Sequence, residues 1–450
     1  METYFNTYFS KETKTANLAV FRVFFGIMMF FSTLRFLSYG WVDKLYIQPK
    51  FFFSYYGFEW IKPLGVYTYA LFIVCLISSF LIIIGYKYRY SIIVFFLCFT
   101  YIELMDKTTY LNHYYFVSCL SFLLLFLPAN RRFSLDAYFD NSLNQEYIPK
   151  WNVDCIKVML FIVYFYAGLA KLNGDWLLEA MPLKIWLPSN YDLPILGSLL
   201  QKGWVHYAFS WGGALYDLII PFLLLYKPTR WFGFFMVVVF HVLTRILFPI
   251  GVFPFVMIVS ALIFFDSDFH EKLIHKASKL LKLKPVKNSV MVQRSPRKIP
   301  LLIIGLFLLI QLLLPWRYLL YENELFWTEE GYRFSWRVML MEKAGYAQFK
   351  VVDSSNGKSF LIDNNDFLTS FQEKQMSTQP DFMLQYAHYL ADHFSENGAK
   401  NIEVYVESYV AINGRLSQPY VDPKVDLAKE KDSFAPKKWI LNFNDDIKGL

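Results

Sequence analysis

The chain has 450 residues, of which 56% are hydrophobic, 20% aromatic and only 18% charged. Soluble domains carry about 25% charged residues, so this composition excludes a disordered protein and argues against a single soluble globule. The formal net charge is +7, with 14 basic and 20 acidic residues in 321–450 against 30 and 17 in 1–320. The basic excess therefore lies in the apolar part, which is typical of a membrane protein with basic cytoplasmic loops rather than of a nucleic-acid-binding protein.

Nine apolar segments are candidates for membrane-spanning helices, which need about 20 mostly apolar residues. In chain order they are residues 17–37, 65–85, 90–106, 110–128, 152–172, 206–226, 231–247, 250–265 and 300–320. If the N-terminus is cytoplasmic, the inner connecting segments hold 18 Lys and Arg residues and the outer ones hold 6. The positive-inside rule then favours this orientation, with the C-terminal part outside.

The sequence predicts an all-α membrane bundle of about nine helices, followed by a small extracytoplasmic α+β domain. The expected parts are a transmembrane bundle (1–265), a basic cytoplasmic linker (266–299), the last transmembrane helix (300–320) and the α+β domain (321–450). The linker is either an amphipathic helix on anionic lipid or a solvated basic loop, and it contains Lys272, Lys276, Lys279, Lys282, Lys284 and Lys287.

Alternation and helical spacing of apolar residues predict the elements of the last domain. Strands are expected at 346–352 and 358–362, on either side of a turn that contains Asn356-Gly357, a recognised hairpin signal. A helix is expected at 379–395 and a further strand at 402–412.

Asp106, Lys107, His113 and Lys171 fall near the outer ends of three different predicted spans. Charges at membrane depth are costly, so each needs a partner or a function. Lys171 ends a nearly uncharged run, and apolar surroundings favour the neutral amine, which can act as a base.

Structural roles remain open for the same residues. Lys171 could extend to the membrane surface or pair with Asp175, and His113 could be a buried, hydrogen-bonded histidine. Asp217 is expected to pair with a cation from another helix. The chain has no phosphate-binding loop, no HExxH motif and no cysteine spacing typical of zinc.

Around these residues the chain resembles the vitamin K-dependent γ-glutamyl carboxylase family, whose membrane part is called the horizontally transferred transmembrane domain. Five blocks carry the resemblance, in order along the chain: Asp106-Lys107-Thr108 with Asn112-His113; Tyr164 to Gly168 with Lys171, Asp175 and Trp176; Phe240-His241 to Phe253; Trp327 to Trp336; and Ala411 to Asp426. Five blocks in one chain are far more specific than any single one.

The resemblance implies that reduced vitamin K is deprotonated by a lysine and oxygenated, and that the resulting strong base removes a γ-proton from a peptide glutamate. Addition of CO₂ then gives γ-carboxyglutamate and vitamin K epoxide. By this resemblance the base is Lys171, and the active-site pair is Asn112 and His113.

The same resemblance implies the partners and the remaining site residues. The implied cofactors are a reduced vitamin K (phylloquinol or menaquinol), O₂ and CO₂, without a metal, and the implied partners are a glutamate-containing peptide or protein and membrane lipids, without nucleic acid. The expected cofactor contacts are Asp106, Lys107, Tyr166 and His241, and the expected substrate contacts are Trp327, Tyr332, Arg333 and Trp336.

The chain departs from the animal members of this family. It is much shorter, and Ala170 stands where animal members have a second lysine. A short member in a bacterial cytoplasmic membrane is therefore expected. Two alternatives stay open: a membrane quinol epoxidase or oxygenase that does not carboxylate protein, and a transporter or scaffold without enzymatic activity.

Overall fold

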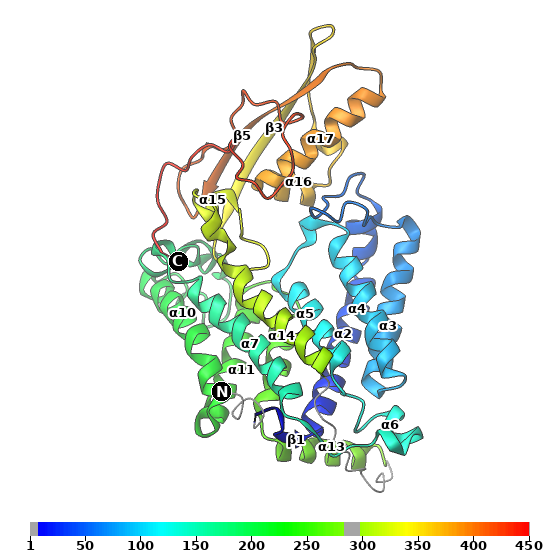
Figure 1. The fold of residues 1–450 in the computed structure, drawn as a ribbon. Helices are drawn as coiled ribbons and strands as arrows, with labels where there is room; N and C mark the ends of the chain where they lie inside the picture. The colour runs from blue at the N-terminus through cyan, green and yellow to red at the C-terminus, as the bar shows by residue number, and fades with distance from the viewer. Residues whose placement is uncertain (1–7, 283–297, 450) are drawn as a thin grey trace.

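The computed structural model describes residues 8–282 and 298–449. A helical part occupies one end of the elongated molecule, and an α+β domain occupies the other (Figure 1). The main helices of the helical part are α2 (Ala16–Ser38), α3 (Thr68–Ile84), α4 (Tyr88–Leu104), α5 (Asn112–Phe126), α7 (Trp151–Leu169), α10 (Gly203–Leu225), α11 (Arg230–Leu247), α12 (Phe253–Ala261) and α14 (Lys298–Leu313).

Shorter elements connect these helices. They are β1 (Glu12–Lys14), β2 (Tyr147–Pro149), α6 (Leu135–Phe139), α8 (Gly174–Leu177), α9 (Leu183–Trp186) and α13 (Ser267–Leu280), together with the π-helical turn Asp43–Ile47 and the 3₁₀ turns Gly65–Tyr67, Lys107–Thr109, Asn141–Leu143, Pro188–Asn190, Lys227–Thr229, Leu262–Phe264 and Leu314–Leu320.

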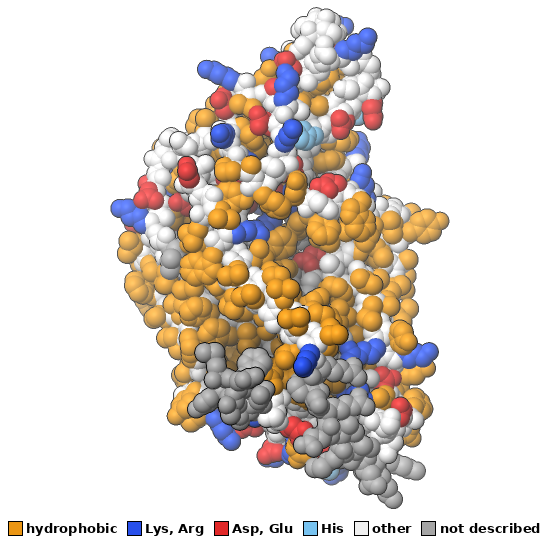
Figure 2. Space-filling model, in the orientation of Figure 1, with side chains coloured by type: hydrophobic (Ala, Val, Ile, Leu, Met, Phe, Trp, Pro, Cys, Tyr) orange, Lys and Arg blue, Asp and Glu red, His pale blue; other side chains and the backbone are white. Residues whose placement is uncertain are grey.

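The described residues contain six helices that are long and apolar enough to cross a membrane, or seven if the bent pair formed by α12 and α13 counts as one span. Each of the nine predicted segments is helical, but nine spans are not confirmed, because α4 has 17 residues and α5 has 15. Large apolar side chains cover much of the helical part on the face that Figure 2 shows. This surface is suited to contact with lipid rather than with water.

Close approach of α7 and α10 is a central feature of the bundle. A Cβ atom at Gly168 would lie only 2.8 Å from the backbone nitrogen of Leu218, so a larger residue would push the helices apart. The glycine therefore allows the end of α7 to lie directly against the middle of α10.

At the end of the bundle away from the α+β domain, α13 turns by 115° from the preceding helical segment. It buries His270 and Ile274 and leaves Lys272, Lys276 and Lys279 on its other side. Of the predicted linker, Ser267–Leu280 is thus an amphipathic helix. Lys284 and Lys287 lie outside the described residues.

The C-terminal domain is an antiparallel sheet of order β4-β3-β5-β6 with helices packed against it. Its elements are α15 (Leu325–Thr328), β3 (Lys343–Asp353), β4 (Lys358–Leu361), α16 (Ser370–Met376), α17 (Pro380–Glu396), β5 (Ile402–Ile412), β6 (Gln418–Pro419) and the 3₁₀ turn Asn364–Asp366. The predicted hairpin, helix and last strand are confirmed, and the structure adds α16 and the short edge strand β6.

One hydrophobic core continues from this domain into the outer end of the bundle. Trp176 of α8 and Leu183 of α9 belong to the same cluster as Phe382 of α17 and Val406 of β5. Phe53, in the segment after α2, packs on Phe382 with a ring-centroid distance of 4.8 Å. The domain is therefore packed onto the bundle and not merely tethered to it.

A buried carboxylate also joins the two parts. The oxygens of Asp175 accept hydrogen bonds from Nη1 and Nη2 of Arg415, each at 2.7 Å, and one of them accepts a third from Nδ2 of Asn413 at 2.7 Å. Asp175 is 4% exposed. A two-point Arg–carboxylate contact at such a buried site fixes both distance and orientation between α8 and the end of β5.

We expect Asp175→Asn to lower the free energy of unfolding by about 2 kcal/mol, because it removes charge-assisted hydrogen bonds at a buried site and leaves Arg415 only its pair with the more exposed Asp445, at 2.7 Å. Thermal unfolding in detergent measures the change. Asp268→Asn is the matched control, since it removes an exposed pair with Lys14 at 3.0 Å and should cost at most about 1 kcal/mol. Equal shifts for the two variants would contradict the role of Asp175.

Candidate active site

A cavity of about 780 Å³ lies within the bundle, on the side of the C-terminal domain. Its walls come from the consecutive helices α7 to α12 and from residues of the segment before β3. The lining is mainly aromatic and aliphatic, with Tyr164, Trp176, Trp186, Phe209, Phe240, Phe248 and Phe253 among its members. Such a lining is suited to a flat apolar ligand.

Lys171 projects into this cavity from the turn that ends α7. Its Nζ donates to Oδ2 of Asp217 at 2.7 Å and to the carbonyl oxygen of Ala167 at 3.0 Å. The same nitrogen lies 5.4 Å from the centre of the Trp176 ring. Both charged side chains are buried, so an ion pair stands in otherwise apolar surroundings. Asp217 thus has a cation from another segment as its partner, as expected from the sequence, but the partner expected for Lys171 was Asp175, which bonds Arg415 instead.

A second polar pair, Tyr164 and His241, lines the same cavity. Oη of Tyr164 lies 3.2 Å from Nε2 of His241. The other ring nitrogen of His241, Nδ1, is buried and has no hydrogen-bond partner among the described residues. An unpartnered polar atom inside an apolar cavity indicates a place where a ligand can bond.

His113 lies one ring away from the cavity. Its ring centre is 5.7 Å from that of Phe253, and the ring centre of His241 is also 5.7 Å from Phe253. Phe253 itself lines the cavity, whereas His113 is not among the lining residues.

Asn112 contributes by holding backbone. Its Nδ2 donates to the carbonyl oxygen of Arg337 at 2.9 Å, and its Oδ1 accepts from Oη of Tyr110 at 3.0 Å. The amide of Phe334 in turn donates to that tyrosine oxygen at 2.8 Å. These bonds fix the segment that continues into Val338 and Met339, which form part of the cavity wall.

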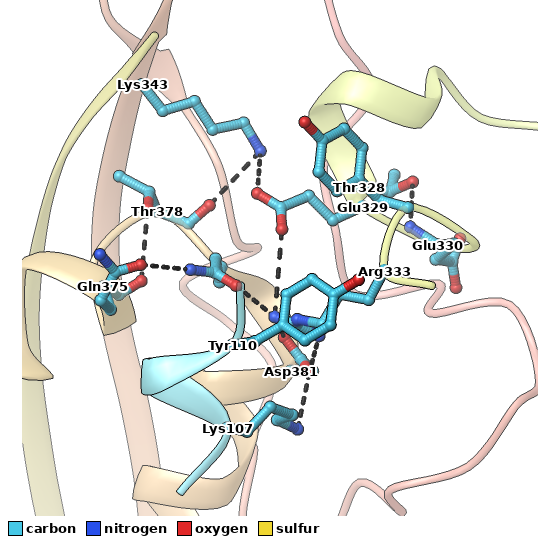
Figure 3. Close-up of polar contacts among 12 residues, drawn as sticks. Lys107, Tyr110, Thr328, Glu329, Glu330, Arg333, Lys343, Gln375, Thr378 and Asp381 are labelled. Carbon is cyan, nitrogen blue, oxygen red and sulfur yellow. Dashed lines mark hydrogen bonds and ion pairs between the residues drawn. The ribbon is translucent and has the colours of Figure 1, made fainter. Parts of the chain in front are cut away.

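Lys107 and Arg333 meet in a buried ion network between the bundle and the C-terminal domain (Figure 3). Oδ2 of Asp381 lies 2.8 Å from Nζ of Lys107 and 2.7 Å from Nη1 of Arg333. Arg333 also bonds the side-chain oxygen of Gln379. On the other side of the network, Nζ of Lys343 lies 2.8 Å from Oε1 of Glu329.

Asp106 belongs to the same junction. Its Oδ1 accepts from the amide of Thr108 at 3.0 Å, and its Oδ2 accepts from Nε2 of Gln372 at 3.3 Å. Asp106 and Lys107 thus contact the C-terminal domain, and neither is among the residues that line the cavity. The convergence expected at the outer ends of the spans is therefore divided: Lys171 faces the cavity, and Asp106 and Lys107 face the domain.

The remaining predicted site residues also lie outside the cavity lining. Oη of Tyr166 accepts from Nε1 of Trp316 at 2.7 Å. Trp327 is in the core of the C-terminal domain, where its Nε1 donates to the carbonyl oxygen of Leu441 at 2.8 Å. Trp336 stacks on Tyr115 with a centroid distance of 5.0 Å, and Tyr332 packs against Phe326.

Sequence reasoning missed Asp381 and the wall formed by Val338 and Met339. Asp381 lies in the first turn of an amphipathic helix of the C-terminal domain, where an acidic residue is ordinary, so no local signal marks it. The sequence signal lay instead on its partner Lys107, which borders a predicted span and therefore needs a counter-charge.

A further apolar pocket, of about 450 Å³, lies in the first half of the bundle. Glu103 of α4 lines it together with Tyr46, Phe72 and Tyr114. It contains none of the predicted site residues, so the cavity at Lys171 is the better candidate active site.

The pH dependence of stability tests the junction. Burial opposes the ionisation of Asp381, but Arg333 and Lys107 outweigh it and hold the pKa of this carboxyl well below its ordinary value. The stabilisation is therefore complete above the unfolded pKa of about 4 and is lost as the pH falls below it. We expect the melting temperature of the wild type to drop between about pH 4 and 3, with a smaller drop in Asp381→Asn. Parallel pH profiles of the two proteins would contradict this role.

Comparisons with known proteins agree with the two parts of the fold. Residues 10–269 match the family model of the HTTM domain. Residues 296–446 match the model of the vitamin K-dependent gamma-carboxylase, lumenal domain, which indicates that the C-terminal part is extracytoplasmic. No solved structure matches the chain. The chain therefore belongs to the HTTM-domain family, in the group whose members carry the lumenal domain of vitamin K-dependent gamma-carboxylase.

Proposed function

We propose that the protein is an integral-membrane carboxylase that couples the epoxidation of a vitamin K-type quinol to the γ-carboxylation of peptide glutamate. The observation that carries this proposal is the buried pair Lys171–Asp217 in an aromatic-lined cavity, with a segment of the lumenal domain in its wall. A hydrophobic quinol can enter such a cavity from the bilayer, whereas a peptide reaches the lumenal domain from water.

The residues present fit a quinol. Trp176, Phe240 and Phe253 offer faces and edges for a flat ring, and Nζ of Lys171 and Nδ1 of His241 are polar atoms at which ring oxygens can bond. The bound quinol would supply, through its reaction with O₂, the strong base that removal of a glutamate γ-proton requires.

In this proposal Nζ of Lys171 is the proton acceptor for a hydroxyl group in the cavity. Asp217 fixes the amine at 2.7 Å and takes the proton of the pair, so that a neutral amine is available. Oδ2 of Asp217 accepts directly from the amine, so a proton can pass between them along this hydrogen bond.

The other residues position the site and keep water out. Asn112 holds the backbone of Arg337, and Val338 and Met339 cover the cavity from the side of the lumenal domain. His113 supports Phe253, which lies between it and His241. Exclusion of water matters because a strong base would otherwise be quenched by proton transfer from solvent.

The proposed orientation places the N-terminus in the cytoplasm and the lumenal domain outside. It is supported by the basic helix α13, at the end of the molecule away from that domain (Figure 1), and by the lumenal-domain match. We keep the four parts 1–265, 266–299, 300–320 and 321–450 as the working division of the chain.

The test uses purified protein with reduced vitamin K or menaquinol, O₂, labelled CO₂ and a short glutamate peptide. We expect label in the peptide together with quinone epoxide, and a fall of both products by about 10²- to 10⁴-fold in Lys171→Ala, the usual effect of losing a catalytic base. Lys157→Ala is the matched control, because Lys157 is on the same helix and pairs with Asp154 at 3.8 Å instead.

Other outcomes discriminate between the functions. Epoxide without label would favour a quinol epoxidase, and neither product with either quinol would favour a transporter or scaffold. Equal activity of Lys171→Ala and Lys157→Ala would overturn the assignment of the base.

The role of Asp217 has its own expected outcome. Asp217→Asn keeps the size of the side chain but removes its ability to take a proton, so epoxide formation should fall by about 10²-fold or more. Measurement of epoxide at several quinol concentrations should place the loss mainly in kcat. An unchanged kcat would contradict proton transfer through Asp217.

A further inference from the structure

A smaller pocket, of about 280 Å³, lies beside the Lys171 cavity. Leu169 and Ala170, in the last turn of α7, form one wall, and Ser335 and Arg337 form another. The next residues in each segment, Lys171 on one side and Val338 and Met339 on the other, line the larger cavity. The two spaces therefore share the end of α7 and the segment 335–339 as neighbouring walls.

Arg337 is the one charged residue among those that line this smaller pocket. The residue is 5% exposed. Within residues 8–282 and 298–449, its Nε and Nη1 groups have no hydrogen-bond partner. Its guanidinium carbon lies instead over the rings of Tyr318 and Phe326, at 4.6 and 5.9 Å from their centres.

The neighbouring polar groups are occupied. Oη of Tyr166 donates to the carbonyl oxygen of Leu312 at 2.6 Å and accepts from Trp316. The hydroxyl of Ser335 donates to the carbonyl oxygen of Tyr332. The guanidinium of Arg337 also interacts with the hydroxyl group of Tyr318, but its Nε and Nη1 remain buried donors without a partner among the described residues.

A buried guanidinium without a counter-charge is costly, and contact with aromatic rings compensates only part of that cost. Arg333, four residues earlier, shows the ordinary arrangement, because Asp381 and Gln379 bond its guanidinium. Arg337 has the free N–H groups that a planar anion such as a carboxylate would bond.

We infer that Arg337 anchors the side-chain carboxylate of the glutamate substrate in this pocket, next to the Lys171 cavity. The inference rests on the proposed function, because it takes a peptide glutamate as the substrate. It assigns carboxylate binding to Arg337 and leaves Arg333 as a residue of the domain junction. A carboxylate held here places the adjoining carbon atoms of its side chain beside the wall shared with the cavity.

Binding without quinol tests this inference separately from the reaction. The probe is a fluorescently labelled short peptide with a single glutamate, and its comparison is the same peptide with glutamine. Full-length protein in lipid nanodiscs should bind the glutamate peptide about tenfold or more tightly than the glutamine peptide, as expected for hydrogen bonds to a charged group. Arg337→Gln should abolish this preference, and Lys358→Gln, an exposed charge in the same domain, should keep it.

Stability supplies the readout that a structural role would not give. Removal of an unpaired buried charge should leave the melting temperature of Arg337→Gln unchanged or raise it, whereas Arg333→Gln, which breaks a buried pair, should lower it. If both variants are destabilised alike, Arg337 is a structural residue and the inference fails.

Two further results would overturn the inference. One is a wild type that binds the glutamate and glutamine peptides equally. The other is a preference for the glutamate peptide that survives in Arg337→Gln, together with a changed dependence of the carboxylation rate on bicarbonate concentration in that variant. That result would assign the pocket to the inorganic anion. Absence of quinol epoxidation in the wild type would contradict the proposed function. It would not change the peptide-binding result, so the two failures can be told apart.

Discussion

An ion pair buried among aromatic rings is the constraint on which the rest of this structure depends. Lys171 and Asp217 come from different helices, and they meet because Gly168 allows α7 to lie against α10. Removing two charges from water is costly, so the pair persists only where the surrounding protein fixes its geometry. Aromatic side chains keep the rest of the cavity apolar. Where water is excluded, charges interact strongly, so the transfer of one proton changes the electrostatics of the whole cavity.

The lumenal domain completes the cavity, because Val338 and Met339 precede its first strand. Its position depends on contacts far from the cavity: Arg415 on Asp175, and Asp381 on Lys107. Asn112 then transmits that position to the wall through the carbonyl oxygen of Arg337. The contacts that attach the domain therefore also position the wall of the cavity. This explains why some charged residues at the ends of the spans hold the domain, whereas Lys171 faces the cavity.

Much of the fold could be predicted from local sequence patterns. Apolar length gave the helices of the bundle, and strict alternation gave residues 402–412 as a strand with the same ends that the structure has. The expected nine spans are not confirmed, because α4 and α5 have the composition of full spans but form helices of 17 and 15 residues. The length of a helix depends on where turns end it, and composition alone does not show those positions.

The site was predictable in part. A charge in an apolar run needs a partner, and Asp217 does pair with a cation from another segment, as expected. Asp175 was the partner expected for Lys171, and the pair Lys171–Asp217 could not be predicted because it depends on how the helices pack. The ion pair of Lys107 with Asp381 could not be predicted either, because it arises only when the two domains meet. Arg337 carried no local signal, because its isolation is a property of the folded environment.

The most direct measurement is a structure of the protein in lipid nanodiscs with a bound reduced quinol, determined without oxygen. We expect the quinol ring to lie between Trp176 and Phe253, with one ring oxygen within hydrogen-bond distance of Nζ of Lys171. A quinol bound instead in the pocket around Glu103, or on the lipid-facing surface, with the Lys171–Asp217 pair unchanged and out of reach, would contradict it.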